Sequence, residues 1–185
     1  MKVYFARHGE YQNPEGVVPY RMPGFPLTEL GISQSGLQAE KLLSLNIRDI
    51  FSSPIERCVQ TASIIGSSLH LAVNQSESLT EIGSPLEGVS IVKRDSYTGN
   101  FPYDVAEHIE GGGETKQVVV ERMAEFVGKL KLMSKNSSHL LVSHGDPIKY
   151  YLSHVTKKDI PLIPMGGLVC LDYNQVGIPK YTEII

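Results

Sequence analysis

Two arginines and two histidines, Arg7, His8, Arg57 and His144, fall where predicted strands end or where a predicted helix begins. Arg7 and His8 directly follow the first apolar run, and His144 directly follows the stretch Leu-Leu-Val-Ser. Arg57 lies in the first turn of a helix predicted after another apolar run. In open parallel sheets, ligands bind outside the carboxyl ends of the strands, where helix N-termini add partial positive charge. We therefore expect these four side chains to converge at one sheet edge and to bind a phosphate group.

The elements that must position these residues alternate along the chain as short apolar runs and helical segments. This alternation predicts an α/β architecture around a mostly parallel central sheet. Strands are expected at 2–6, 49–52, 71–73, 139–143, 168–173 and 180–184. Helices are expected to begin near Thr28, after Ser53-Pro54, near Glu114 and at Asp146-Pro147. The continuously apolar run before His144 is typical of a strand at the centre of the sheet.

Two of the helix starts carry residues that are typical of helix caps. Ser53-Pro54-Ile55-Glu56 has the pattern of a capping box with proline at the first helical position. Asp146 precedes Pro147, so we interpret Asp146 as the N-cap of the helix that follows His144. A carboxylate that accepts backbone N–H bonds has a lowered pKa, which would make Asp146 a poor proton donor near neutrality.

Two segments depart from the alternation of strands and helices. Residues 11–26 are rich in proline and glycine, and we expect a loop after the first strand. Residues 87–113 contain glycines, aromatic side chains and mixed charge without a sustained period, and they end in three glycines. We interpret 87–113 as an excursion from a single domain of residues 1–185, forming a lid or a substrate-facing loop.

The overall composition limits the classes of partner. The 185 residues are 41% hydrophobic and 20% charged, and this is typical of one soluble globular domain. A net charge of -3 argues against nucleic acid as the main partner. Cys58 and Cys170 both fall in apolar patterns and are expected to be reduced core thiols. We find neither a basic and apolar leader nor an apolar run of membrane-spanning length, so we expect a cytoplasmic protein without a membrane partner.

Six short motifs, taken together, resemble the histidine phosphatase superfamily, the phosphoglycerate mutase-like group. They occur in the order that the family shows, and they cover nearly the whole chain. The motifs are RHGE at 7–10, PLTELGISQ at 26–34, SSPIERCVQTA at 52–62, LTEIG at 79–83, GGET at 112–115 and VSHGDPIK at 142–149. The resemblance implies a three-layer α/β/α sandwich around the mostly parallel sheet.

The resemblance also implies a role for each matching residue. His8 would be the nucleophile that takes the phosphoryl group as phosphohistidine, which requires an unprotonated ring nitrogen aimed at phosphorus. Arg7, Arg57 and His144 would hold the phosphoryl oxygens. Glu81 would be the general acid that protonates the leaving oxygen and then the base that activates water.

One loop departs from the pattern of the resembled family. Family members of the mutase type usually carry serine three residues after the nucleophile and asparagine six residues after it. This chain has Tyr11 and Pro14 at those places, and its asparagine, Asn13, comes one residue early. We expect Asn13 to replace the usual contact from this loop to the phosphate.

These observations favour a phosphatase that hydrolyses a small phosphorylated metabolite and needs no cofactor. The alternatives are a phosphoglycerate mutase and a phosphoprotein-binding module without turnover. The altered residues Tyr11 and Pro14 favour hydrolysis over the mutase reaction. A metal site at His8 and His144 is not expected, because no third ligand has suitable spacing. The sequence leaves open which ester is the substrate and whether the protein is a homodimer.

Overall fold

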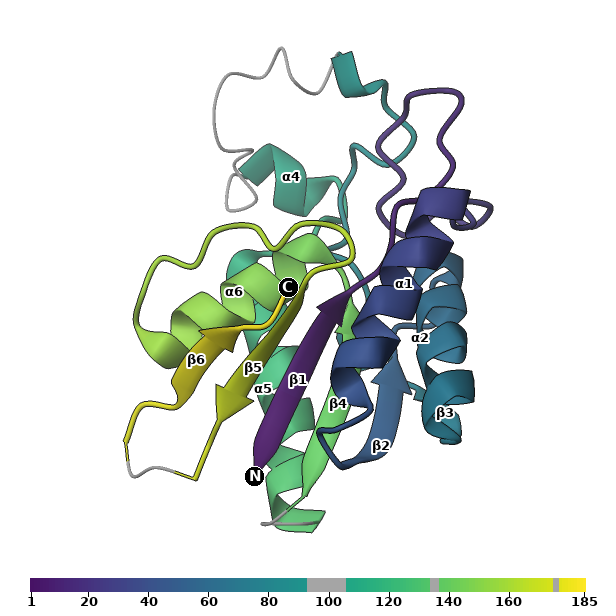
Figure 1. The fold of residues 1–185 in the computed structure, drawn as a ribbon. Helices are drawn as coiled ribbons and strands as arrows, with labels where there is room; N and C mark the ends of the chain where they lie inside the picture. Colours follow the sequence, from purple (N-terminus) through teal and green to yellow (C-terminus); the bar gives the residue numbers. More distant parts are fainter. Residues whose placement is uncertain (93–105, 134–136, 175–176) are drawn as a thin grey trace.

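The centre of the molecule is a six-stranded sheet with the strand order β3-β2-β4-β1-β5-β6 (Figure 1). A computed structural model describes residues 1–92, 106–133, 137–174 and 177–185. The strands are β1 Lys2–Arg7, β2 Ile47–Ser52, β3 Val73–Gln75, β4 Ser138–Ser143, β5 Leu168–Asp172 and β6 Lys180–Glu183. The β1–β4, β4–β2 and β2–β3 pairs are parallel, whereas β5 and β6 pair antiparallel. The predicted mostly parallel sheet, with the continuously apolar strand at its centre, is confirmed.

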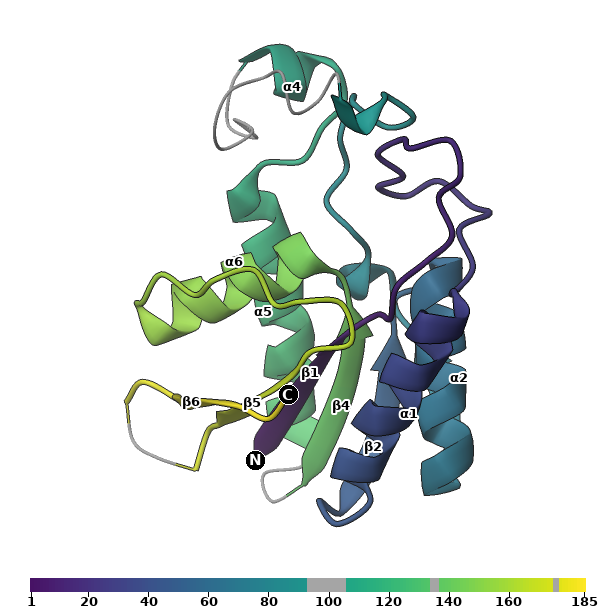
Figure 2. The same cartoon turned by 45° about the horizontal axis from the view of Figure 1, so that its top comes forward.

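Helices cover both faces of this sheet, so the predicted three-layer architecture is also confirmed (Figures 1 and 2). One face packs against α1 and α2, and the other face packs against α5 and α6. The bounds are α1 Glu29–Leu42, α2 Glu56–Leu69, α4 Ala106–Glu110, α5 Lys116–Met133 and α6 Gly145–Thr156, with a 3-10 turn at Glu77–Leu79. Within the described ranges, no helix has the length and apolar character needed to span a membrane.

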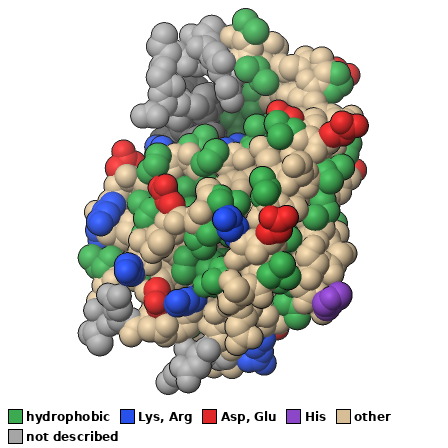
Figure 3. Space-filling model, viewed as in Figure 1, with side chains coloured by type: hydrophobic (Ala, Val, Ile, Leu, Met, Phe, Trp, Pro, Cys, Tyr) green, Lys and Arg blue, Asp and Glu red, His purple; other side chains and the backbone are tan. Residues whose placement is uncertain are grey.

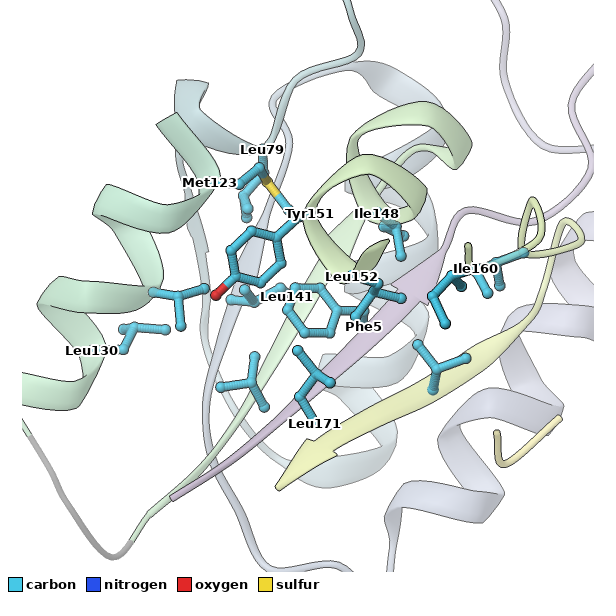
Figure 4. Packing of buried hydrophobic residues seen from close by; sticks show 14 of the residues in the cluster. Phe5, Leu79, Met123, Leu130, Leu141, Ile148, Tyr151, Leu152, Ile160 and Leu171 are labelled. Carbon is cyan, nitrogen blue, oxygen red and sulfur yellow. The ribbon is translucent and has the colours of Figure 1, made fainter. Parts of the chain in front are cut away.

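Side chains of β1 alternate between two buried cores. Tyr4 and Ala6 point into the core beneath α1 and α2, whereas Phe5 points into the core beneath α5 and α6. The Phe5 ring lies against Tyr151 of α6, with a centroid distance of 5.6 Å (Figure 4). Burying one such large apolar side chain contributes about 1.5–3 kcal/mol, so the two cores hold the end of β1, and the residues after it, in place.

Two helix caps that the sequence suggested are wrong. Helix α2 begins at Glu56 with Ile55 as N-cap, and Ser53 lies outside it. Helix α6 has His144 as its N-cap, which places Asp146 in the first turn. For α2 the physical reason is a tertiary contact, because the hydroxyl of Ser53 lies 2.9 Å from Nε2 of His144.

The two segments that were predicted as loops are linked by backbone hydrogen bonds. Val18 donates to the carbonyl of Val89 at 2.8 Å, and Gly88 donates to the carbonyl of Val18 at 2.9 Å. The loop after β1 is therefore tied to the start of the predicted excursion 87–113. Residues 93–105 of that excursion lie outside the described residues, so the lid stays a prediction.

The surface carries charges of both signs, and both cysteines lie in the interior. On the face that Figure 3 shows, Lys and Arg side chains are interspersed with Asp and Glu side chains. Among the described residues of this face, neither sign of charge forms a continuous area. Cys58 and Cys170 are both buried and free, as the sequence predicted.

A close backbone contact fixes α1 against the chain just after His8, and it yields a stability prediction. A Cβ at Gly31 would lie 2.0 Å from the backbone oxygen of Glu10. We expect Gly31→Ala to lower the free energy of unfolding by at least about 1–3 kcal/mol, because backbone must move to admit the methyl group. Gly36→Ala in the same helix is the control, since nothing lies within 4 Å of the added Cβ. Thermal unfolding should show Gly36→Ala stabilised by about 0.5–1 kcal/mol, and equal behaviour of both variants would contradict this reading.

Candidate active site

The carboxyl ends of three neighbouring parallel strands bring the predicted site residues together. His8 follows β1, and its backbone N–H donates to the carbonyl of Ser143 at the end of β4, at 3.1 Å. Ser53 follows β2 and donates in the same way to the carbonyl of Val142, at 2.9 Å. The rings of His8 and His144 consequently lie 5.2 Å apart. In both Figure 1 and Figure 2 this end of the sheet faces the loop after β1.

The hydrogen bonds of His8 determine which of its ring nitrogens carries the proton. Its Nδ1 lies 2.8 Å from the carbonyl oxygen of Gly9, and because a carbonyl only accepts, Nδ1 must carry the proton. The side chain is 2% exposed. Burial, together with the positive charges of Arg57 and Arg7, holds the pKa of His8 well below its usual value. The ring is therefore neutral, and Nε2 has an unprotonated lone pair.

Arg57 connects both histidines. Its Nε donates to Nε2 of His8 at 3.3 Å, and its Nη2 donates to Nδ1 of His144 at 3.1 Å. The same Nη2 donates to the backbone carbonyl of Tyr20 at 2.6 Å, so the loop after β1 also reaches the site. The arginine is 2% exposed. A buried positive charge beside two neutral imidazoles makes this site attractive to an anion.

Two guanidinium nitrogens at this site have no hydrogen-bond partner within the part of the chain that the structure describes. They are Nη1 of Arg57 and Nε of Arg7, both buried. Arg7 is otherwise anchored, because its Nη1 donates to the carbonyl of Ile163 at 2.7 Å. A buried donor without an acceptor is costly, and such groups commonly mark a ligand site. Both nitrogens are suitable donors to the oxygens of a phosphoryl group.

His144 has a different hydrogen-bond arrangement from His8. Because a guanidinium only donates, Nδ1 of His144 is the acceptor from Arg57, and Nε2 carries the proton toward Ser53 Oγ at 2.9 Å. Burial and the charge of Arg57 hold the pKa of His144 well below its usual value. To donate to a phosphoryl oxygen, the ring would have to gain a proton at Nδ1, and an incoming dianion favours that protonation.

Two further residues of the site were not singled out from sequence. Ser53 receives the hydrogen bond of His144, and Sγ of Cys58 lies 3.4 Å from the same Nε2. Burial raises the pKa of the Cys58 thiol to about 12, so the sulfur stays protonated. The position of Ser53 directly after a predicted strand could have indicated a site residue. Its fit to a capping box led instead to the prediction of a helix cap.

Glu81 lies in the loop after the 3-10 turn, with its side chain 14% exposed and Oε2 3.9 Å from Nδ1 of His144. Its Oε1 accepts a hydrogen bond from the backbone of Ile82 at 2.9 Å. Burial, followed by the negative charge of Asp146, raises the pKa of Glu81 to about 7. A carboxyl group with this pKa can hold a proton near neutrality and release it to a reacting oxygen.

In the loop after His8, Tyr11 contacts the site, whereas Asn13 bonds to the backbone of its own loop. The Tyr11 ring packs edge-on against His8, with centroids 5.5 Å apart, and the guanidinium carbon of Arg57 lies 5.2 Å from the Tyr11 centroid. The amide of Asn13 exchanges two hydrogen bonds with the backbone of Val17, at 2.8 and 3.2 Å. Contact between Asn13 and a phosphate stays a prediction, and the amide would have to leave Val17 to make it.

Comparison with known proteins identifies the family. Residues 3–177 match the family model of the histidine phosphatase superfamily (branch 1). The chain belongs to this superfamily. A probable phosphoglycerate mutase from Proteus mirabilis is 30% identical over 191 residues, covering 99% of this chain and 78% of the relative. The resemblance that the motifs indicated is thereby confirmed.

Solved structures of phosphatases share the fold of this chain. A mycobacterial glucosyl-3-phosphoglycerate phosphatase in complex with VO3 superimposes with a TM-score of 0.84 at 20% identity, covering 100% of this chain and 97% of the other. The alpha-ribazole phosphatase from Shigella flexneri gives a TM-score of 0.78 at 23% identity, with coverage of 100% and 95%. At such identities the likeness establishes the phosphoglycerate mutase-like fold and leaves the substrate open.

Proposed function

We propose that this protein is a phosphatase that hydrolyses a small phosphorylated metabolite through a phosphohistidine intermediate at His8. The main observation in support of this proposal is that His8 is buried and neutral with an unprotonated Nε2. The hydrogen bond from Nδ1 to the Gly9 carbonyl fixes this tautomer. Unpartnered N–H groups of Arg7 and Arg57 are buried at the same site. These groups support a nucleophile and donors for the phosphoryl oxygens, and Nε2 of His8 can attack once its lone pair leaves Nε of Arg57.

In the first step, Nε2 of His8 attacks phosphorus and the bond from phosphorus to the ester oxygen breaks. The electron pair of that bond goes to the leaving oxygen, and the proton of Glu81 neutralises it, so an alcohol departs. Arg7 and Arg57 balance the charge on the phosphoryl oxygens throughout. Burial and the positive guanidinium groups also disfavour protonation of His8, which keeps Nε2 unprotonated.

In the second step, water attacks the phosphoryl group and the bond from phosphorus to Nε2 breaks. Glu81, now ionised, accepts a proton from the attacking water, while Nε2 regains its lone pair. Inorganic phosphate leaves and Glu81 is protonated again. The reaction thus returns every group to its starting state, and neither step requires a cofactor.

The runner-up is a phosphoglycerate mutase, because a probable enzyme of that name is among the relatives. Both reactions use the same phosphohistidine, and they differ in whether water or a second hydroxyl takes the phosphoryl group. A panel of phosphate esters, including 3-phosphoglycerate with its bisphosphate primer, separates the two. We expect release of inorganic phosphate without isomerisation, and isomerised phosphoglycerate would instead establish the mutase. Failure to hydrolyse any ester, p-nitrophenyl phosphate included, would favour a binding module.

A second measurement concerns metal dependence. Within the described ranges, no group of three or more His, Cys, Asp or Glu side chains is arranged to hold a metal ion. Because Arg7 and Arg57 supply positive charge at the phosphoryl group, we expect hydrolysis to be unchanged in excess EDTA. Vanadate and inorganic phosphate should inhibit competitively, since both present oxyanions to the same donors. Loss of activity on chelation, with recovery on adding back one metal, would overturn this expectation.

A further inference from the structure

A cluster of charged side chains that the proposed mechanism does not use contacts the backbone of Glu81. Glu114 is at its centre, and Oε2 of Glu114 accepts hydrogen bonds from Arg21 Nη2 at 2.5 Å and from Arg122 Nη2 at 3.2 Å. The same oxygen accepts from the backbone N–H of Gly83 at 3.0 Å. The cluster thus joins three segments that are distant in sequence, namely the loop after β1, the loop that carries Glu81, and helix α5.

Both arginines of this cluster also hold the backbone carbonyl of Glu81. Nε of Arg21 donates to that oxygen at 2.7 Å, and Nη2 of Arg122 donates to it at 3.2 Å. Arg122 is fixed further by its Nη1, which donates to the carbonyl of Ser78 at 2.7 Å. A carbonyl that accepts from two guanidinium groups on different elements has little freedom to rotate its peptide plane.

The charge state of the cluster supports a positioning role over a role in binding anions. Burial alone would raise the pKa of Glu114, but the charges and hydrogen bonds of Arg122, Gly83 and Arg21 lower it overall, so the carboxylate stays ionised. Each arginine is therefore already paired with this carboxylate and with the Glu81 carbonyl. Nε of Arg122 is buried without a partner among the described residues, but the nitrogens of both arginines that face Glu114 and Glu81 are committed to those oxygens.

We propose that Glu114, Arg21 and Arg122 form a positioning unit that fixes the peptide of Glu81 and thereby aims its carboxyl group at the leaving oxygen. The inference rests on the proposed function, because it concerns the general acid of that reaction. The carboxyl group of Glu81 accepts from the backbone N–H of Ile82, and this N–H belongs to the same peptide unit as the Glu81 carbonyl. Fixing that peptide unit therefore also fixes the direction of the carboxyl group. Positioning within a fraction of an ångström is what efficient proton transfer requires.

The decisive variant is Glu114→Gln, which keeps the shape of the side chain but removes the charge that orients both arginines. Its kcat/KM should fall by roughly ten- to a hundred-fold on an ester with a basic leaving group, such as phenyl phosphate or an alkyl phosphate. On p-nitrophenyl phosphate, whose leaving group needs little protonation, the loss should stay below about three-fold. A purely structural role would lower both rates together.

Two controls separate the positioning unit from general destabilisation. Glu125→Gln makes the same substitution on the exposed surface of α5, where Glu125 pairs only weakly with Lys129, and both rates should be unchanged. Arg21→Lys alters the partly exposed member of the cluster, whose side chain is 37% exposed. An ammonium group lacks the guanidinium fork, so Arg21→Lys should give the same selective loss, smaller in size.

A double variant completes the test. When Glu81 is already glutamine, adding Glu114→Gln should cause no further selective loss, because no proton remains to be aimed. Equal loss on both leaving groups, or full additivity in the double variant, would overturn the positioning role while leaving the phosphatase in place. Absence of hydrolysis in the wild type would instead overturn the proposed function.

Discussion

His8→Ala should remove nearly all hydrolysis of phosphate esters while the protein stays folded. The loss should be at least roughly a thousand-fold, as is usual when a covalent nucleophile is deleted. Cys58, the other potential nucleophile beside His144, holds its proton and is not a replacement for His8. The side-chain bond that His8 makes through Nδ1 is local, to its neighbour Gly9, so circular dichroism and thermal unfolding should show a folded variant.

Covalent trapping identifies the nucleophile directly. Brief incubation of the wild type with a labelled phosphate donor, followed by an alkaline quench, should leave label on the protein that acid releases. His154→Ala is a matched control, because His154 is exposed on α6 and lies outside the site. That variant should be labelled like the wild type, and His8→Ala should not be labelled. Label surviving on His8→Ala would refute the assignment.

The sequence was informative about the site wherever position along a strand determines position in space. Arg7 is the last residue of β1, and His8 and His144 directly follow β1 and β4. The parallel register of these strands places Arg7 opposite Ser143. Both strands are short apolar runs that end in polar residues, so their carboxyl ends can be located from the sequence. The convergence of the arginine and histidine side chains could therefore be predicted without coordinates.

The hydrogen-bond partners of the site residues could not be predicted from the sequence. They depend on the paths of the loops and on which of several possible partners each polar group bonds. The tautomer of His8 depends on where the carbonyl of Gly9 points, and Tyr20 reaches Arg57 through a backbone oxygen that any residue would provide. Ser53 fits a capping pattern, yet its hydroxyl accepts from His144. Asn13 carries a suitable amide, yet that amide closes its own loop on Val17. In each case a tertiary contact decides what a side chain or carbonyl does.

Replacing Glu81 should reveal the general acid through the choice of leaving group. Glu81→Gln keeps the side chain's size but removes the proton that the departing oxygen needs. We expect kcat/KM to fall by roughly a hundred- to ten-thousand-fold on an alkyl phosphate and far less on p-nitrophenyl phosphate. Both substrates report on the same nucleophile, so the ratio of the two losses isolates proton donation.

The pH dependence gives an independent signature of the same group. Burial and the charge of Asp146 raise the pKa of Glu81 to about 7, while Arg57 and Arg7 act in the opposite direction. Glu81 is protonated below that pH, so kcat/KM on the alkyl phosphate should decline as pH rises through this range. The decline should be absent in Glu81→Gln, and it should be weak on p-nitrophenyl phosphate.

Asp146→Asn is the variant that tests this assignment most severely, because Asp146 is the other carboxyl group beside Glu81. The carboxyl group of Asp146 is hydrogen-bonded to Tyr150, a residue four positions further along α6. Its charge is one cause of the raised pKa of Glu81, so removing that charge should move the decline in kcat/KM to lower pH. The leaving-group ratio at low pH should stay near that of the wild type. If Asp146→Asn instead shows the selective loss on the alkyl phosphate and Glu81→Gln does not, then Asp146 is the acid and the roles of the two carboxyl groups are reversed.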